Sequence, residues 1–292
     1  QVTYDETHQP PLYYLICALA TSGIDMTDDL QPEVNPYLKD GYTLNAYIRG
    51  PEYAWPWTGS VLGMHVARCV SMGMGALIVW LTYRIGRRLA PDQPHLAIVS
   101  MALVAFMPQF LFMSSVVTND IAVALFSTVA LLLLVRLEQK PTLHDVLWLV
   151  PVTLATILTK ANGVALLPAA LSVLIVAVLR RWKALTWGKR LGLIAATVIL
   201  VAAVIGVLAL WESWNVALQG TASSVSGALS RFILPALQSS GTRSQIFSLS
   251  ELSWGLLYTY RTFWASFGLG NIQIGAAYYP LMGLLMLAGM VG

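Results

Sequence analysis

The sequence is poor in charged residues. Only 11% of its 292 residues are Asp, Glu, Lys or Arg, whereas about a quarter of a typical soluble domain is charged. Together with a hydrophobic content of 57% and a mean hydropathy of +0.68, this deficit predicts a polytopic membrane protein. The net charge of +3 is small and the basic residues cluster beside apolar runs. Nucleic acid is therefore not a predicted partner, whereas membrane lipids are.

Cysteines and the common catalytic motifs are also scarce. Cys17 and Cys69 both lie inside apolar segments, which favours small buried hydrophobic side chains over a disulfide or a metal site. The sequence has no glycine-rich nucleotide loop, Gly-x-Ser-x-Gly, His-Glu-x-x-His or paired Cys-x-x-Cys. Acidic residues are almost missing from the apolar runs, which counts against an ion-coupled transporter or a proton pump.

What the sequence does contain is a series of apolar runs, seven or eight of which qualify or nearly qualify as spanning helices of about 20 residues. The runs occupy about residues 11–24, 59–83, 96–116, 121–135, 146–158, 164–179, 191–211, 252–267 and 272 onward. We expect an all-α, polytopic integral membrane protein with a single transmembrane domain over residues 1–292. Because the chain starts with Gln1 and stops inside an apolar run, we expect this domain to be incomplete at both ends.

Lysine and arginine concentrate in three short loops, and positive residues stay on the cytoplasmic side of a membrane. The loops hold Arg84, Arg87 and Arg88; Arg136 and Lys140; and Arg180, Arg181, Lys183, Lys189 and Arg190. They alternate with the spans if the amino-terminal end is outside. This topology predicts a multi-pass protein of the plasma (inner) membrane. The two long loops, 25–57 and 215–250, and any active site then lie on its outer side.

Titratable side chains precede the first apolar run, which Pro10 and Pro11 introduce. The charged form of a carboxylate near lipid is disfavoured, so the pKa of Asp5 or Glu6 would rise toward the range of a general base. The alternative is a solvated loop ahead of a helix. His8 could donate a hydrogen bond to a phosphate, or be an ordinary surface residue.

Three basic residues are candidates for binding an anion. Arg68 shares a helix face with His65 and Ser71, and an arginine in a span should face the protein interior, a water-filled cavity or an anion. Lys160 lies at the outer end of a helix pair, and Arg261 lies in an aromatic segment. Together they predict a basic lining for an anionic headgroup, although each could instead anchor its helix at the interface.

Four stretches of the sequence resemble GT-C-type membrane glycosyltransferases, which include protein O-mannosyltransferase-like and aminoarabinose-transferase-like enzymes. Tyr-Asp-Glu-Thr-His-Gln-Pro-Pro-Leu-Tyr-Tyr, residues 4–14, resembles the His-(x)-Pro-Pro-Leu-Tyr-Tyr stretch that closes the first outer loop of these enzymes, and looks closest to a bacterial branch of membrane proteins. The other three are His65-x-x-Arg68-x-x-Ser71 followed by Gly75 and Tyr83, Thr118-Asn119-Asp120, and Phe263-Trp264-Ala265-Ser266-Phe267-Gly268. From the residues alone, helix capping is the first explanation for Asn119 and Asp120.

The resemblance implies transfer of a sugar from a polyprenyl-phosphate donor on the outer face of the membrane. In such enzymes an acidic residue of the first outer loop deprotonates the acceptor hydroxyl, and basic residues hold the lipid phosphate. These roles fall here on Asp5 or Glu6, and on His8, Arg68, Lys160 and Arg261. The family's Asp-Glu usually follows a first spanning helix, which this sequence does not show. Whether Asp5 and Glu6 are the catalytic pair or a second acidic element therefore stays open.

Other hypotheses also remain open. A non-catalytic membrane subunit could use the same fold to pack against protein partners in a larger complex, and a lipid or solute transporter is a weaker alternative. No cofactor is certain. The acidic outer face could attract a divalent cation, but no ligand spacing specifies one.

Overall fold

A computed structural model describes residues 9–28, 33–34, 47–48, 50–219, 249–267 and 272–291. These residues are mostly helical, which confirms the all-α fold class. Two short antiparallel strand pairs interrupt the helices: β1 (Glu33–Val34) with β2 (Tyr47–Ile48), and β3 (Ser266–Phe267) with β4 (Ile272–Gln273). Contacts divide the chain into two compact units, which we describe separately. The single-domain prediction stays a prediction.

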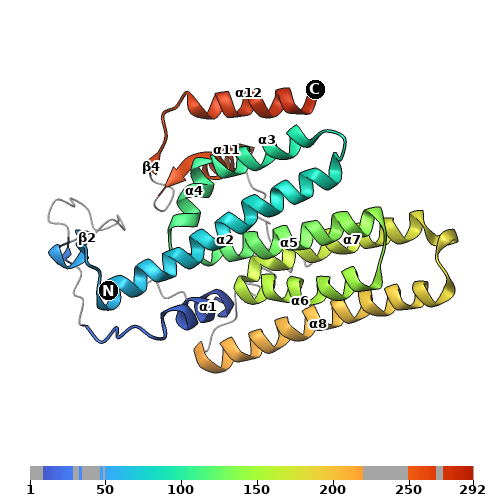
Figure 1. Cartoon of the computed structure of the whole chain (residues 1–292), viewed down its shortest axis with the longest axis horizontal. Helices are drawn as coiled ribbons and strands as arrows, with labels where there is room; N and C mark the ends of the chain where they lie inside the picture. Colours follow the sequence, from blue (N-terminus) through green and yellow to red (C-terminus); the bar gives the residue numbers. More distant parts are fainter. Residues whose placement is uncertain are drawn as a thin grey trace, which may run out of the picture. The chain divides into compact units, whose positions relative to one another are not determined.

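The first unit comprises residues 1–17, 73–102 and 118–244 and holds a bundle of four helices. In this bundle α6 lies against both α5 and α8, and α7 packs on α5 (Figure 1). Short 3-10 turns join α6 to α7 and α7 to α8. The elements are α5 (Asn119–Gln139), α6 (Leu143–Thr159), η2 (Ala161–Ala165), α7 (Leu166–Arg180), η3 (Trp182–Ala184) and α8 (Trp187–Gln219).

Small side chains allow these helices to approach one another. Ala130, Ala170 and Ala196 are all nearly inaccessible, and they share one core cluster with larger residues such as Leu149. Lipid tails are as apolar as leucine, so close van der Waals packing rather than water exclusion drives helix association in a bilayer. Alanines at the contacts therefore favour this bundle.

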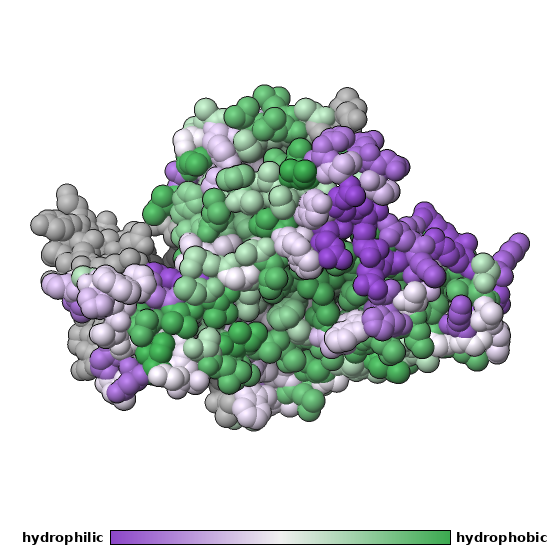
Figure 2. All heavy atoms as spheres, in the orientation of Figure 1, coloured by the Kyte–Doolittle hydropathy of each residue, from purple (hydrophilic) through white to green (hydrophobic). Residues whose placement is uncertain are grey.

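Hydrophilic residues gather at one end of the first unit (Figure 2). Arg180 pairs with Glu138 at 2.8 Å, and the half-exposed Arg136 pairs with the buried Asp145 at 2.8 Å. Nearby, the side-chain amide of Gln139 donates to the carbonyl of Arg88 at 2.8 Å. We call this set the arginine end. It joins the ends of α2, α5 and α7 to the start of α6.

The second unit comprises residues 18–72, 103–117 and 245–292. In it, Gln109 accepts a hydrogen bond from the Ser266 backbone N–H at 2.8 Å, and the Tyr279 hydroxyl donates to the Ala265 carbonyl at 2.5 Å. These contacts tie α4 and α12 to the end of α11. The unit holds η1 (Pro51–Tyr53), α4 (Pro108–Ser115), α11 (Leu249–Ala265) and α12 (Tyr278–Val291). Three helices are divided between the units: α1 (Leu12–Thr21), α2 (Gly59–Leu89) and α3 (Pro94–Ala105).

Several helices can cross a bilayer by length and composition. Four qualify among the described residues, and the pair α3 and α4, bent by 60°, would make a fifth. The expected seven or eight spans are therefore not fully confirmed, because three further apolar helices are shorter than a span. The four are Gly59–Leu89, Asn119–Gln139, Ala161–Arg180 and Trp187–Ala217; the three are Leu12–Thr21, Leu143–Thr159 and Tyr278–Ala288. The chain is a multi-pass membrane protein.

Some details differ from the expectations. The run expected at 96–116 is broken because Pro108, at the start of α4, has no N–H and holds Met107 in an extended conformation. Helix α8 continues to Gln219, so the start of the expected loop 215–250 is helical. Neither cysteine forms a disulfide with another described residue. Cys17 is buried, but Cys69 is exposed on α2, so its expected burial is wrong.

The acidic segment between α1 and α2 caps α2. The exposed Asp28 carboxylate accepts hydrogen bonds from the Ser60 hydroxyl at 2.5 Å and from the Ser60 N–H at 2.9 Å. These bonds lower the pKa of Asp28, the hydroxyl more than the N–H. Gly59 has a φ of +53°, and a β-carbon there would overlap the Asp28 carboxylate. Glycine at this position therefore lets the cap form.

Candidate functional site

The candidate site lies where α5 begins and α6 ends. Thr118 is extended, and its hydroxyl oxygen accepts a hydrogen bond from the Asp120 N–H at 3.3 Å. Thr118 is therefore the N-cap, and the expectation that Asn119 and Asp120 cap the helix is wrong. Because the threonine hydroxyl already satisfies this backbone N–H, the two following side chains are available for contacts with other segments.

Asp120 forms an ion pair with Lys160 at the end of α6. The Lys160 Nζ lies 2.6 Å from Asp120 Oδ1, and the Thr118 hydroxyl donates to Asp120 Oδ2 at 3.2 Å. The side chains are 24% exposed for Lys160 and 44% for Asp120. An ammonium has three N–H donors, and this carboxylate occupies one of them. Lys160 is thus fixed in place while its partner stays in contact with solvent.

Asn119 connects the same place to the start of the described chain. Its side chain is buried, and its amide N–H₂ donates to the side-chain oxygen of Gln9 and to the Thr159 carbonyl, the latter at 3.3 Å. Both donors of the amide are used. The structure therefore joins the Gln-Pro-Pro motif to the Thr-Asn-Asp motif. We call Gln9, Asn119, Asp120 and Lys160 the lysine end.

A tight turn positions Lys160. The Gly163 N–H donates to the Lys160 carbonyl at 2.9 Å, and the Lys160 N–H donates to the Thr156 carbonyl at 3.1 Å. A β-carbon on Gly163 would lie 2.6 Å from the Thr156 carbonyl oxygen, which belongs to the backbone and cannot easily move. Only glycine fits this turn without displacing the end of α6.

A groove of about 470 Å³ opens beside the lysine end, within the range of about 300–1,000 Å³ typical of small-ligand sites. Trp211 and Trp214, three positions apart on α8, contribute its aromatic wall. The indole N–H of Trp211 is buried without a hydrogen-bond partner in the described part of the chain. We call this groove the Gln9 groove. It is lined by Gln9, Pro11, Leu158, Val207, Leu210, Trp211 and Trp214.

The predicted site residues are distributed over parts of the chain that are described separately or not at all. Asp5, Glu6 and His8 lie outside the described residues. Lys160 belongs to the first unit, whereas Arg68 and Arg261 belong to the second. A lining made by all three basic residues stays a prediction.

The two arginines of the second unit have different surroundings. Arg68 is half-buried on α2, one turn from His65, whose ring stacks on Trp57 at 3.6 Å between centroids. Arg261 donates to the Gln273 side-chain oxygen at 3.4 Å, and its guanidinium carbon lies 5.7 Å from the centroid of the Tyr279 ring. These contacts hold Arg261 against β4 and α12.

Sequence reasoning assigned no site role to Gln9, Asn119, Trp211 or Trp214. Asn119 could not be told from a capping residue without knowing that its side chain is buried. The two tryptophans near Glu212, at the end of an apolar run, were a usable signal, because aromatic residues mark membrane interfaces. No group of three or more His, Cys, Asp or Glu side chains that could hold a metal ion occurs among the described residues. The divalent cation stays a prediction.

Comparison with known proteins gives one family. The model described as dolichyl-phosphate-mannose-protein mannosyltransferase matches residues 58–206, about half of the chain. The match includes Arg68, Asn119, Asp120 and Lys160 and ends shortly before Trp211. The searches of curated proteins and of solved structures found no match.

Proposed function

The chain belongs to the dolichyl-phosphate-mannose-protein mannosyltransferase family of GT-C-type membrane glycosyltransferases, and from this membership we propose that it transfers a sugar from a polyprenyl-phosphate carrier to an acceptor at the outer face of the plasma membrane. The family indicates a membrane glycosyltransferase with a polyprenyl-phosphate sugar donor. The outer face and the residue roles below belong to the proposal.

One observation carries the proposal: the contact between Asn119 and Gln9. This contact holds Gln9 at the start of α5, and in the sequence Gln9 directly follows His8 and lies three positions after Glu6. Lys160 is held at the same end by Asp120. In the sequence, the candidate base therefore lies within four residues of Gln9, which the structure places near the candidate phosphate-binding cation and beside a groove of ligand size.

The proposed reaction is a displacement at the sugar's anomeric carbon. The acceptor oxygen forms a bond to that carbon as the bond to the phosphate oxygen breaks, and the hydroxyl proton passes to the carboxylate of Asp5 or Glu6. The leaving lipid phosphate keeps the electron pair. Lys160, with His8, Arg68 and Arg261, stabilises its negative charge, a contribution that grows as the charge develops.

Lys160 suits this role because its present partner is exchangeable. Asp120 is 44% exposed, so water can solvate its carboxylate when an incoming phosphate takes over the ammonium. The donor phosphodiester carries one negative charge, as the carboxylate does, and the phosphate gains a second as its bond to the sugar breaks; charge-assisted hydrogen bonds to it are strong. The Gln9 groove then accommodates the part of the donor next to the phosphate.

The acid pair provides the test. Membranes containing the Asp5→Asn, Glu6→Gln double variant are supplied with polyprenyl-phosphate mannose, and sugar transfer is compared with that of the unsubstituted chain. We expect transfer to be abolished at equal protein level. The matched control is Glu138→Gln, a carboxylate at the arginine end, which should retain activity. Full activity in the double variant would refute the assignment of the base.

A further inference from the structure

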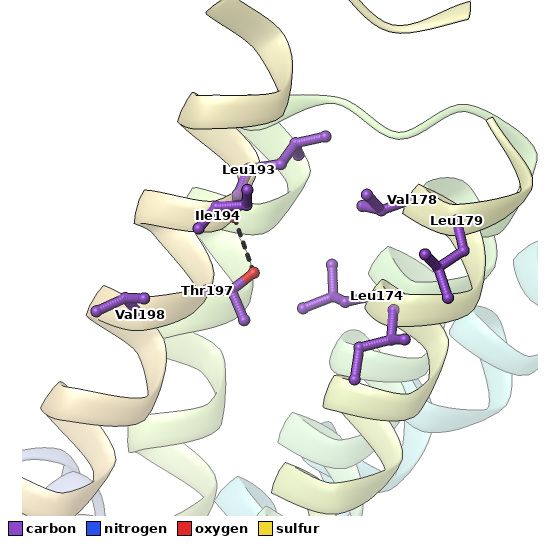
Figure 3. Close-up of a pocket in the computed structure, with 8 residues that line it drawn as sticks. Leu174, Val178, Leu179, Leu193, Ile194, Thr197 and Val198 are labelled. Carbon is purple, nitrogen blue, oxygen red and sulfur yellow. Dashed lines mark hydrogen bonds between the residues drawn. The ribbon is translucent and has the colours of Figure 1, made fainter. Parts of the chain in front are cut away.

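A second groove lies between α7 and α8, and its lining is almost entirely aliphatic (Figure 3). Leu174 and Val178 on α7 face Leu193 and Thr197 on α8 across it. The Thr197 hydroxyl donates to the Leu193 carbonyl at 2.8 Å, so it is already satisfied. We call this groove the α7–α8 groove. It is lined by Leu174, Ile175, Val178, Leu179, Leu193, Ile194, Thr197 and Val198.

The size and exposure of this groove indicate what it can hold. Its volume is about 230 Å³, smaller than the usual pocket of a whole small ligand. Leu179 and Val198, on its two sides, are 66% and 61% exposed. In a multi-pass protein, strongly exposed aliphatic residues along a spanning helix face lipid. The groove therefore suits one segment of an acyl chain that enters sideways from the bilayer.

Positive charge lies directly at one end of this groove. Arg180 follows Leu179 in sequence, and Arg190 precedes Leu193 by one helical turn, about 5 Å along the axis. Five basic residues lie in the turn between α7 and α8 or in the adjoining helix ends: Arg180, Arg181, Lys183, Lys189 and Arg190. An aliphatic groove with a cationic rim matches the two parts of an acidic lipid.

The rim cations are not all used by the protein. Arg180 pairs with the Glu138 carboxylate and Arg181 donates to the Glu138 carbonyl at 2.7 Å. Lys183 and Lys189, in contrast, are exposed and form no ion pair with the described residues. Two charges at this turn are therefore left for a ligand.

Arg190 adds a third donor that is held in place. Its guanidinium carbon lies 4.6 Å from the centroid of the Trp182 ring, and its Nε is buried without a hydrogen-bond partner in the described part of the chain. Trp187 beside it is 69% exposed. Tryptophans of this kind occupy the boundary between lipid and water, which puts Arg190 at the depth of lipid phosphates.

We propose that this turn and the α7–α8 groove bind an anionic phospholipid of the surrounding bilayer. One acyl chain lies in the groove, and the phosphate contacts Lys183, Lys189 and Arg190. Basic pockets between spanning helices recognise acidic headgroups in this way. Positive charges alone are enough to orient a protein in the membrane, and they need no groove beside them. Here a groove adjoins the charges and two of the lysines are unpaired, which indicates a bound lipid. The proposal does not depend on sugar transfer.

Native mass spectrometry of the purified chain in mild detergent tests the headgroup. The probes are phosphatidylglycerol and phosphatidylcholine with identical acyl chains. We expect phosphatidylglycerol to be retained preferentially. The Lys183→Gln, Lys189→Gln double variant should lower the affinity for phosphatidylglycerol about thirtyfold. Lys140→Gln, which removes an exposed lysine from another basic loop, is the control and should leave retention unchanged. Equal retention of the two lipids, or equal effects of the lysine variants, would overturn the proposal.

A second pair of variants tests the groove. Val198→Trp fills the groove, whereas Ile205→Trp places the same indole at a position on α8 that is also 61% exposed but does not line it. We expect only Val198→Trp to release phosphatidylglycerol, with both variants unfolding at the same temperature as the original chain. If both variants release the lipid, or if polyprenyl phosphate displaces it from the groove, the assigned occupant is wrong.

Discussion

The two ends of the first unit hold their cations in different ways. At the arginine end, Asp145 is buried; it forms an ion pair with Arg136 at 2.8 Å and accepts a hydrogen bond from the Thr142 hydroxyl at 2.6 Å. At the lysine end, Asp120 is 44% exposed and pairs with Lys160 at 2.6 Å. Losing a partner is costly for a buried carboxylate and cheap for a solvated one. The difference indicates that Arg136 has a structural role, whereas Lys160 can change partner.

The largest effect should come from the lysine end. Lys160→Met keeps much of the side-chain bulk but removes the charge, and we expect kcat/KM for sugar transfer to fall about a hundredfold, as when one transition-state donor is lost. Lys140→Met, a change of the same kind in the basic loop just before the other end of α6, should keep nearly full activity. Unchanged transfer in Lys160→Met would break the contrast between the two ends.

The arginine end should dominate stability. Asp145→Ala leaves the Arg136 guanidinium and the Thr142 hydroxyl without their acceptor, and we expect the free energy of unfolding to drop by about 2 kcal/mol. Asp120→Ala, which removes the exposed partner of Lys160, should cost less than about 1 kcal/mol. Denaturation in detergent mixtures measures both. Equal losses would show that the burial of the acid does not separate the two ends.

The turn at the lysine end can be tested without changing charge. Gly163→Ala forces a β-carbon against the Thr156 carbonyl, and such overpacking should destabilise the chain by about 1.5 kcal/mol. Because the turn orients Lys160, sugar transfer should fall as well. Gly188→Ala places the same methyl group in open space and serves as the control. A Gly163→Ala chain with native stability would argue against the tight turn.

The smallest effect concerns Asp28, which is exposed like Asp120 but caps a helix instead of pairing with a cation. Its pKa is lower in the folded chain than in the unfolded chain, where it is about 3.9. Its contribution to stability is therefore complete above about pH 4 and is lost as the pH falls through the folded pKa. Asp28→Asn should reduce the loss of stability on acidification, measured by thermal unfolding across that range. An unchanged acid dependence would contradict the cap on α2.

Much of the fold could be predicted because apolar runs record helices directly. The runs at 121–135 and 191–211 correspond to α5 and α8, and both helices extend beyond their apolar parts. The break before Pro108 was missed because hydropathy averages over a single proline. Hydropathy also could not tell Cys69, which is exposed, from Cys17, which is buried.

The site was less predictable because its residues come from distant parts of the chain. Lys160 was identified from its place at a helix end, but its pairing with Asp120 depends on how α5 packs against α6. The contact of Asn119 with Gln9 likewise joins positions 110 residues apart. No local pattern encodes such a contact. The family resemblance named both residues 4–14 and Thr118-Asn119-Asp120, but it did not show that these two stretches are in contact.

The length of α8 sets a distance that the bilayer must match. Its 33 residues extend about 50 Å, well beyond a hydrocarbon core of about 30 Å. Trp187 and Trp211 lie about 36 Å apart along it, close to the separation of the two aromatic belts of a membrane. With Trp187 at one interface, Trp211 and the Gln9 groove reach the opposite one, at the level of lipid phosphates. Sugar transfer should therefore depend on acyl-chain length, because a thicker bilayer would draw the groove and Lys160 below the headgroups.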